Sequence, residues 1–168
     1  MSSECEGTRR GRVPVLISAC LVGLPTRYDG RGRLRAELLG SLAGEWLVPV
    51  CPEQLGGLPT PRAAQDIFPG GPGAGSPAPA DAPGSAGGEE VLDGSARVVN
   101  RDGVDVTEAF VRGARSVAEL AERLGARRAY LAARSPSCAA ASYGAGGRLS
   151  GVAAAALARS GVEVIDVE

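Results

Sequence analysis

The chain has 168 residues, of which 44% are hydrophobic, and its 18 basic and 19 acidic residues leave a net charge of -1. This length allows one hydrophobic core and is short for two full domains. The balanced charge gives no electrostatic reason to expect a nucleic-acid partner. We therefore expect a small-molecule substrate, no membrane contact, and a monomer or weak dimer.

The first half of the chain predicts one strand–helix–strand unit. Residues 1–12 are polar and are predicted to form a flexible arm. Apolar runs predict strands at residues 13–19 and 46–50, with a short helix over residues 34–42 between them. Residues 69–88 are almost all Gly, Pro, Ala and Ser, which predicts a disordered insert within a single domain that spans residues 13–168.

The second half predicts another such unit. A strand over residues 95–99 is followed by a tight turn into residues 104–106. Thr107 is a candidate N-cap for a long amphipathic helix that stops at Gly125. Strands at residues 128–133 and 162–167, with an alanine-rich helix near residues 151–160, complete the pattern. This order of elements predicts an α/β fold, a single-domain three-layer sandwich with a mainly parallel sheet.

Histidine is absent from the chain. Its absence removes the commonest acid–base side chain near neutral pH and the commonest metal ligand. A metal held by side chains would need thiolates and carboxylates, which favours iron–sulfur or zinc. The segment before Val13 lacks the apolar stretch of a signal peptide, and no apolar run reaches the roughly 20 residues of a membrane-spanning helix. We therefore expect a cytoplasmic protein whose cysteines are not in disulfides.

Three of the four cysteines, Cys20, Cys51 and Cys138, follow predicted strands. The carboxyl ends of parallel strands share one edge of a sheet, where ligands bind, so these thiols can meet there. Filling core space is the alternative explanation, since cysteine is often buried. The 30 and 86 residues between the cysteines do not match a zinc knuckle or a ferredoxin, and no CxxC pair supports a disulfide reductase. Cys5 lies in the polar arm, where we expect no role for it.

Four stretches around these cysteines resemble, in order, the signatures of the domain-of-unknown-function 523 family, which includes the thiouracil desulfidases: residues 16–23, 27–30, 50–62 and 134–138. The resemblance extends over most of the chain. It implies a [4Fe-4S] cluster bound by Cys20, Cys51 and Cys138, with one iron open to the sulfur of a thiolated substrate. It therefore implies an enzyme that releases sulfide from a thiolated pyrimidine such as 2-thiouracil. A non-enzymatic metal or iron–sulfur protein, acting as a sensor or a structural brace, is the alternative.

The resemblance also implies two catalytic residues, Glu53 and Ser135. Glu53 is the only acidic residue within three positions of the three thiols, which makes it the candidate proton carrier. A carboxylate in the first turn of a helix is also favoured by the helix dipole alone. Arg62, Arg134 and Ser137 are candidate substrate-binding residues. The alternatives are that the arginines are solvated surface charges and that both serines only hydrogen-bond the turn after the strand.

The chain departs from the family pattern near the expected substrate. Ala139 and Ala140 stand where glycines usually follow the last cysteine, and the insert at residues 69–88 enlarges the approach to residues 60–62. These loops lie where a base would bind. The resemblance therefore leaves the identity of the substrate open.

Overall fold

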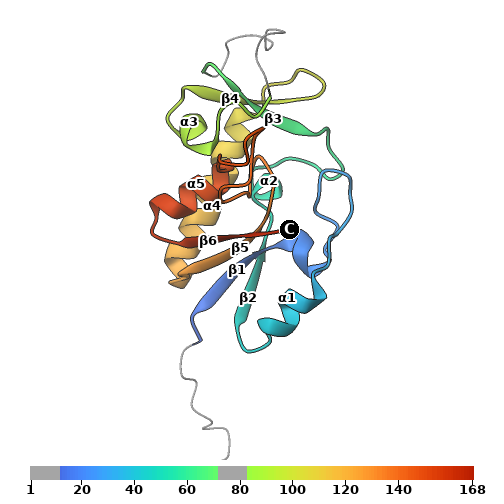
Figure 1. The fold of residues 1–168 in the computed structure, drawn as a ribbon, viewed down its shortest axis with the longest axis vertical. Coiled ribbons are helices and arrows are strands. Elements are labelled where there is room, and N and C mark those ends of the chain that lie inside the picture. The colour runs from blue at the N-terminus through green and yellow to red at the C-terminus, as the bar shows by residue number, and fades with distance from the viewer. Residues whose placement is uncertain (1–11, 72–82) are drawn as a thin grey trace, which may run out of the picture.

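A computed structural model describes residues 12–71 and 83–168, with a four-stranded parallel sheet in the order β2-β1-β5-β6 at its centre (Figure 1). The inner strand β1 is buried along its whole length, as expected for an apolar run between two parallel neighbours. The predicted α/β fold is thereby confirmed. The predicted flexible arm, apart from its last residue, and Cys5 lie outside the described residues. The strands of this sheet are β1 (Pro14–Ser18), β2 (Trp46–Val50), β5 (Arg128–Ala132) and β6 (Glu163–Val167).

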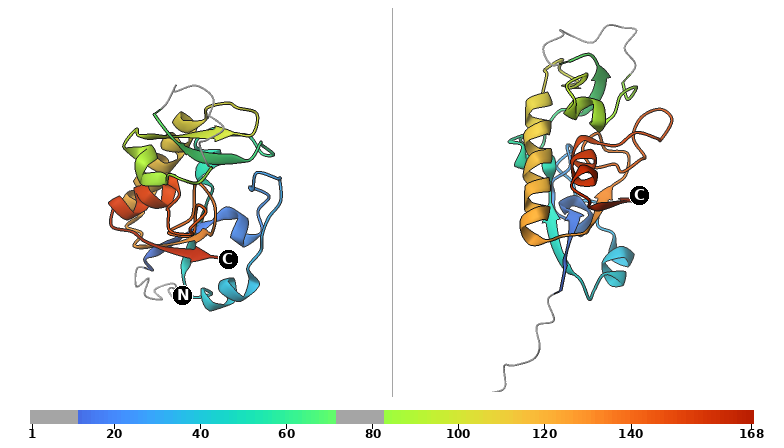
Figure 2. Two further views of the ribbon diagram at one scale, coloured as in Figure 1. Left: turned by 45° about the horizontal axis from the view of Figure 1, so that its top comes forward. Right: turned by 90° about the vertical axis from the view of Figure 1, so that its left-hand side faces the viewer.

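Helices cover both faces of this sheet (Figure 2). Successive residues of a strand point to opposite faces, so adjacent side chains of β1 enter different cores. Leu16 packs with Val117 and Leu157 from two helices on one face, whereas Ile17 packs with Leu39 on the other face. No helix in the described part of the chain is long and apolar enough to cross a membrane. The covering helices are α1 (Ala36–Ser41), α4 (Thr107–Leu124) and α5 (Val152–Arg159).

A second, antiparallel sheet of two strands, β3 (Gln65–Pro69) and β4 (Ala96–Asn100), lies beyond one end of the parallel sheet (Figure 1). The predicted turn after β4 is present: the Asn100 N–H donates to the Val104 carbonyl oxygen at 3.0 Å, and an antiparallel bridge joins Val99 to Asp105. The sequence did not predict the main partner of β4, which is β3, paired with it along five residues. Polar residues and a proline interrupt the apolar alternation of β3, so its sequence does not indicate a strand.

Two local predictions about the ends of elements need correction. Thr107 lies inside α4, and its Oγ1 accepts a hydrogen bond from the Val98 N–H at 2.8 Å, so it joins α4 to β4 and does not cap the helix. The predicted stop at Gly125 is confirmed by its left-handed φ of 68°.

The insert predicted at residues 69–88 is shorter than expected at both ends. Its first residue belongs to β3 and its last residue to α3 (Gly88–Leu92), and residues 72–82 lie outside the described residues.

The short helix α2 (Pro52–Leu55) begins directly after Cys51 and packs tightly on α4. Two glycines allow this close crossing. A Cβ atom on Gly113 would lie 1.9 Å from the Pro52 carbonyl oxygen, and one on Gly56 would lie 2.1 Å from the Ala109 carbonyl oxygen. The crossing therefore fixes where the chain leaves β2.

The Gly113→Ala variant tests this crossing. An alanine is normally preferred to glycine inside a helix by about 1 kcal/mol. Here we expect a net loss of about 1–3 kcal/mol in the free energy of unfolding, because the added methyl group overlaps α2. Gly40→Ala is the matched control, since Gly40 is also helical and has nothing within 4 Å of its Cβ position. Urea unfolding should show the control to be neutral or more stable, and equal effects in both variants would contradict the assigned crossing.

Candidate functional site

A cavity of about 350 Å³ lies beside the ends of three parallel strands and is lined by Cys20, Cys51 and Cys138. Cys20 belongs to the short 3-10 helix η1 (Ala19–Val22) that follows β1, and Cys51 directly follows β2. Cys138 comes after a turn that follows β5. The strands β1 and β2 are paired in register up to their last residues, so both chains leave the sheet at the same level. The fold thus brings together three thiols that are far apart in sequence.

The three thiols are free, and Cys20 and Cys138 are buried. The partly exposed Cys51 donates a hydrogen bond from Sγ to the Thr26 carbonyl oxygen at 3.7 Å. Burial raises the pKa of Cys20, and burial together with the negative charge of Glu53 raises the pKa of Cys138 to about 12. The negative charge of Cys51 also raises the pKa of Cys20, and the charges of Cys20 and Cys51 add to the rise in the pKa of Cys138. Cys20 and Cys138 are therefore protonated at neutral pH unless a positive centre replaces their protons.

The donor set of the cavity fits a cluster better than a single ion. Within residues 12–71 and 83–168, no three His, Cys, Asp or Glu side chains are grouped closely enough to hold one metal ion. An iron–sulfur cluster binds each cysteine through a different iron, so its ligands surround a space and do not meet at a point. Three thiols around one cavity, with soft sulfur as the donor atom, match that requirement.

Glu53 and Arg62 form a buried ion pair at the wall of this cavity. Arg62 donates to the Glu53 carboxylate through Nε and Nη2, and its Nη1 donates to the Thr26 and Pro59 carbonyl oxygens at 3.2 Å and to Thr60 Oγ1 at 3.0 Å. Burial raises the pKa of the Glu53 carboxyl, and the positive charge of Arg62 acts in the opposite direction. Arg62 therefore uses its guanidinium to hold Glu53 and the neighbouring loops in place.

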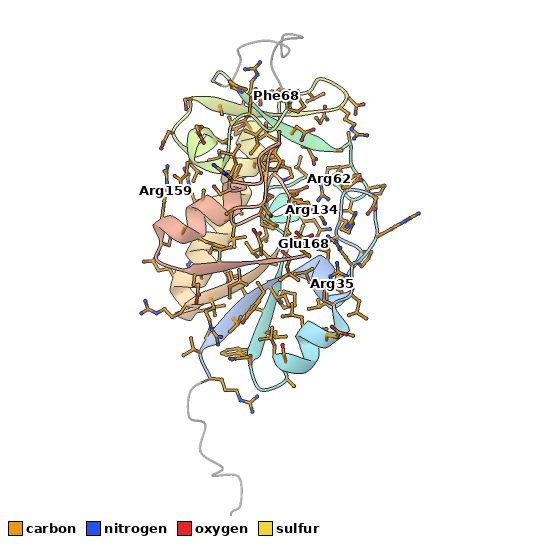
Figure 3. All side chains as sticks on the ribbon, viewed as in Figure 1. Arg35, Arg62, Phe68, Arg134, Arg159 and Glu168 are labelled. Carbon is orange, nitrogen blue, oxygen red and sulfur yellow. The ribbon has the colours of Figure 1, made fainter. Side chains whose placement is uncertain are left out.

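The residues between β5 and α5 hold Cys138 in position. Ser135 lines the cavity, and its Oγ accepts the N–H groups of Ser137 and Cys138 at 3.2 Å each. Ser137 is 2% exposed and is not among the residues that line the cavity. Arg134 lines the cavity in a left-handed conformation, with φ 60°, and its exposed guanidinium pairs with Glu168 (Figure 3). The hydrogen bonds of Ser135 are those expected of a serine that shapes the turn.

Several residues of the cavity had no assigned role in the sequence analysis. Arg27 lies in a stretch that carries the family resemblance, so that resemblance could have pointed to it. Gln65 and Asp66 belong to β3, which the sequence did not predict, and Tyr143 belongs to a glycine-rich loop. No local pattern marks these three residues. The residues concerned are Thr26, Arg27, Arg33, Gln65, Asp66, Arg101 and Tyr143.

The fold and the cavity define an α/β protein with three thiols gathered in one pocket. Comparison with known proteins narrows this class: residues 15–168 match the model of the 2-thiouracil desulfurase family, and the chain belongs to that family. A solved structure of the [4Fe-4S]-dependent thiouracil desulfidase TudS is similar, with a TM-score of 0.70 and 31% identity over 92% of this chain and 91% of that one. The uncharacterized protein YbbK of Bacillus subtilis (strain 168) is 34% identical over 124 residues, 74% of this chain and 72% of YbbK.

Replacing Arg62 by methionine tests the buried ion pair. We expect the free energy of unfolding to fall by about 3–5 kcal/mol, because the variant leaves the Glu53 carboxyl buried without its partner. Arg62→Lys should be intermediate, since lysine keeps the charge but cannot reproduce the planar fork. Arg123→Met is the control, because Arg123 pairs with Glu119 on the exposed face of α4 and such pairs contribute little. Equal denaturant midpoints for Arg62→Met and Arg123→Met would contradict the assigned role.

Proposed function

We propose that this protein removes sulfur from a thiolated pyrimidine or a related heterocycle and releases it as sulfide. The observation that carries the proposal is that Cys20, Cys51 and Cys138 line one cavity together with the buried Glu53–Arg62 pair. Family membership and the similarity to a thiouracil desulfidase support it. The reaction is a hydrolysis: water converts the C=S group to C=O, and the sulfur leaves as hydrogen sulfide without net oxidation or reduction.

A [4Fe-4S] cluster held by Cys20, Cys51 and Cys138 is the cofactor that we propose for this reaction. These are the three cysteines among the described residues, so one iron of such a cluster would have no cysteine ligand from that part of the chain. When bound, the cluster would supply a Lewis acid for the sulfur of the substrate. Burial disfavours the anionic forms of Cys20 and Cys138, and a metal centre bound to these thiols would replace their protons.

Glu53 and Ser135 are the residues that we propose to handle protons. Glu53 is buried at the cavity wall, where its carboxyl can take a proton from water and return it to the departing sulfur. The Ser135 oxygen accepts two backbone N–H groups, which leaves its own O–H free to donate into the cavity. Arg62 positions Glu53. Arg134 at the cavity wall remains a candidate for binding an anionic group of the substrate, whereas the buried Ser137 has no support for such contact.

A non-enzymatic sensor or structural site is the other function to consider. Structural metal sites are closed, whereas catalytic sites keep an open position for substrate. The 350 Å³ cavity beside the thiols matches the open kind and is at the lower end of the sizes found for small-molecule pockets. The geometry therefore supports the enzyme better.

Single cysteine variants test the proposed ligands. Cys20→Ser, Cys51→Ser and Cys138→Ser should each lose the cluster absorption after anaerobic reconstitution with iron and sulfide, because a serine hydroxyl is a poor substitute for a soft thiolate. Cys5→Ser is the matched control and should keep the spectrum and iron content of the wild type. Loss of the cluster in Cys5→Ser together with its retention in Cys51→Ser would overturn the assignment.

The Glu53→Gln variant tests the proton carrier. A positioned acid–base group typically contributes about 10²–10⁴-fold to a rate, so sulfide release from 2-thiouracil should fall at least about a hundredfold while the cluster spectrum is retained. Glu119→Gln, on the exposed face of α4, is the control and should release sulfide at the wild-type rate. A Glu53→Gln protein with an intact cluster and wild-type activity would rule out this role. Absence of sulfide release by the wild type from every thiolated base tested would reject the desulfidase function.

A further inference from the structure

Gln65 is a buried polar residue of the cavity for which neither the fold nor the proposed chemistry has a use. It is the first residue of β3, lines the cavity and is 8% exposed. Among the described residues its side-chain amide forms no hydrogen bond, whereas the exposed Gln54 donates to Thr60 Oγ1 at 2.8 Å. Gln65 therefore presents an unpaired amide at the wall of the pocket.

The Gln65 amide is accessible from the cavity and is not sealed inside the protein. In the described residues, the buried side-chain nitrogen and oxygen atoms without a hydrogen-bond partner are Arg35 Nε and Arg97 Nε, and the Gln65 amide is not among them. A ligand that fills the cavity would exclude water from this amide, which costs free energy unless the ligand hydrogen-bonds to the amide in its place. A ligand with a matching polar edge is therefore the partner to expect at the wall of a substrate-sized cavity.

The neighbours of Gln65 are already paired with one another, which holds its strand in place. The Tyr143 O–H donates to Asp66 Oδ1 at 3.2 Å, and its oxygen accepts the Ile67 N–H at 2.9 Å. Asp66 and Tyr143 also line the cavity. The loop that follows Cys138 is thus joined to the strand that begins with Gln65, so the start of β3 is held in place relative to that loop.

The amide and the thiols come from different parts of the fold. Gln65 belongs to the two-stranded β3–β4 sheet, whereas the three thiols follow strands of the parallel sheet (Figure 1). A ligand that fills the cavity can therefore contact the thiol wall at one end and the Gln65 amide at another. One end of a substrate would undergo the reaction, and another part would be recognised.

A primary amide carries an acceptor oxygen and an NH₂ donor side by side. This pair matches a ring edge that presents a carbonyl oxygen next to an N–H, as in a lactam, and side-chain amides read nucleobase edges by the same two-bond geometry. A ring that carries only the thiocarbonyl and lacks such an edge would leave the Gln65 amide unpaired. Sites built to hydrogen-bond a polar group discriminate against analogues that lack it.

We propose that Gln65 recognises a lactam edge of the substrate, with Oε1 accepting from a ring N–H and Nε2 donating to the adjacent carbonyl oxygen. The substrate class is then a heterocycle with both a thiocarbonyl and a separate lactam carbonyl, as in 2-thiouracil, and not a simple thione such as pyrimidine-2-thione. This inference rests on the proposed function for the fate of the sulfur. The recognition itself concerns the part of the ring that does not react.

Two measurements on the cluster-loaded protein test the inference. Calorimetric titration with uracil, which carries the lactam edge and cannot be desulfurised, should show binding weakened about tenfold to a hundredfold by Gln65→Leu, the range expected for two lost hydrogen bonds. The ratio of kcat/KM for 2-thiouracil to that for pyrimidine-2-thione should fall by a similar factor. Gln54→Leu makes the same substitution on an exposed glutamine outside the cavity and should leave both quantities at wild-type values.

The outcomes separate this inference from the proposed function. If folded Gln65→Leu desulfurises 2-thiouracil with an unchanged substrate ratio and unchanged uracil affinity, lactam recognition is overturned and the desulfidase function stands. If the wild type binds uracil through Gln65 but releases sulfide from no thiolated compound, the recognition stands and the function fails. Should Gln65→Leu not fold, the near-isosteric Gln65→Glu decides, because it loses the donor and must weaken uracil binding.

Discussion

The close crossing of α2 over α4 is the contact on which the geometry of the site depends. The crossing is possible because Gly56 and Gly113 carry no side chain where each helix meets the backbone of the other. Helix α4 is in turn packed against the parallel sheet through Val117. The position of α2 is therefore set relative to the sheet, and α2 begins directly after Cys51 and carries Glu53. A thiol and the proposed proton carrier thus owe their places to one backbone contact.

Burial opposes the ionisation of two thiols and one carboxyl of the cavity, although five arginines also line it. Burial raises the pKa of Cys20, Cys138 and Glu53, so each of these groups is costly as an anion. The guanidinium of Arg62 offsets this cost for Glu53 alone, because its hydrogen bonds go to that carboxylate and to neighbouring loops. A cationic metal centre would lower the cost for the thiols, which links cofactor binding to the stability of this end of the sheet.

The two sheets give the cavity two kinds of wall. The parallel sheet supplies the thiols at the ends of its strands, and the β3–β4 sheet supplies Gln65 and Asp66. The hydroxyl of Tyr143 hydrogen-bonds to β3, which ties one wall to the loop of the other. Under the proposed function, the reaction would take place at the wall formed by the parallel sheet and the substrate would be recognised at the wall formed by β3.

The sequence by itself determined the features that local patterns encode. Continuous apolar runs indicate buried parallel strands, a 3.6-residue periodicity marks α4, and the left-handed end of that helix needs Gly125, so these elements were predictable along with the order of cysteines after strands. Only the tertiary structure decided the rest. Strand β3 has no apolar alternation of its own and exists because it pairs with β4, and Thr107 faces β4 when its sequence suggests a cap. Gln65 lines the same cavity as the thiols. This placement depends on contacts between segments that are distant in sequence, so no local pattern could predict it.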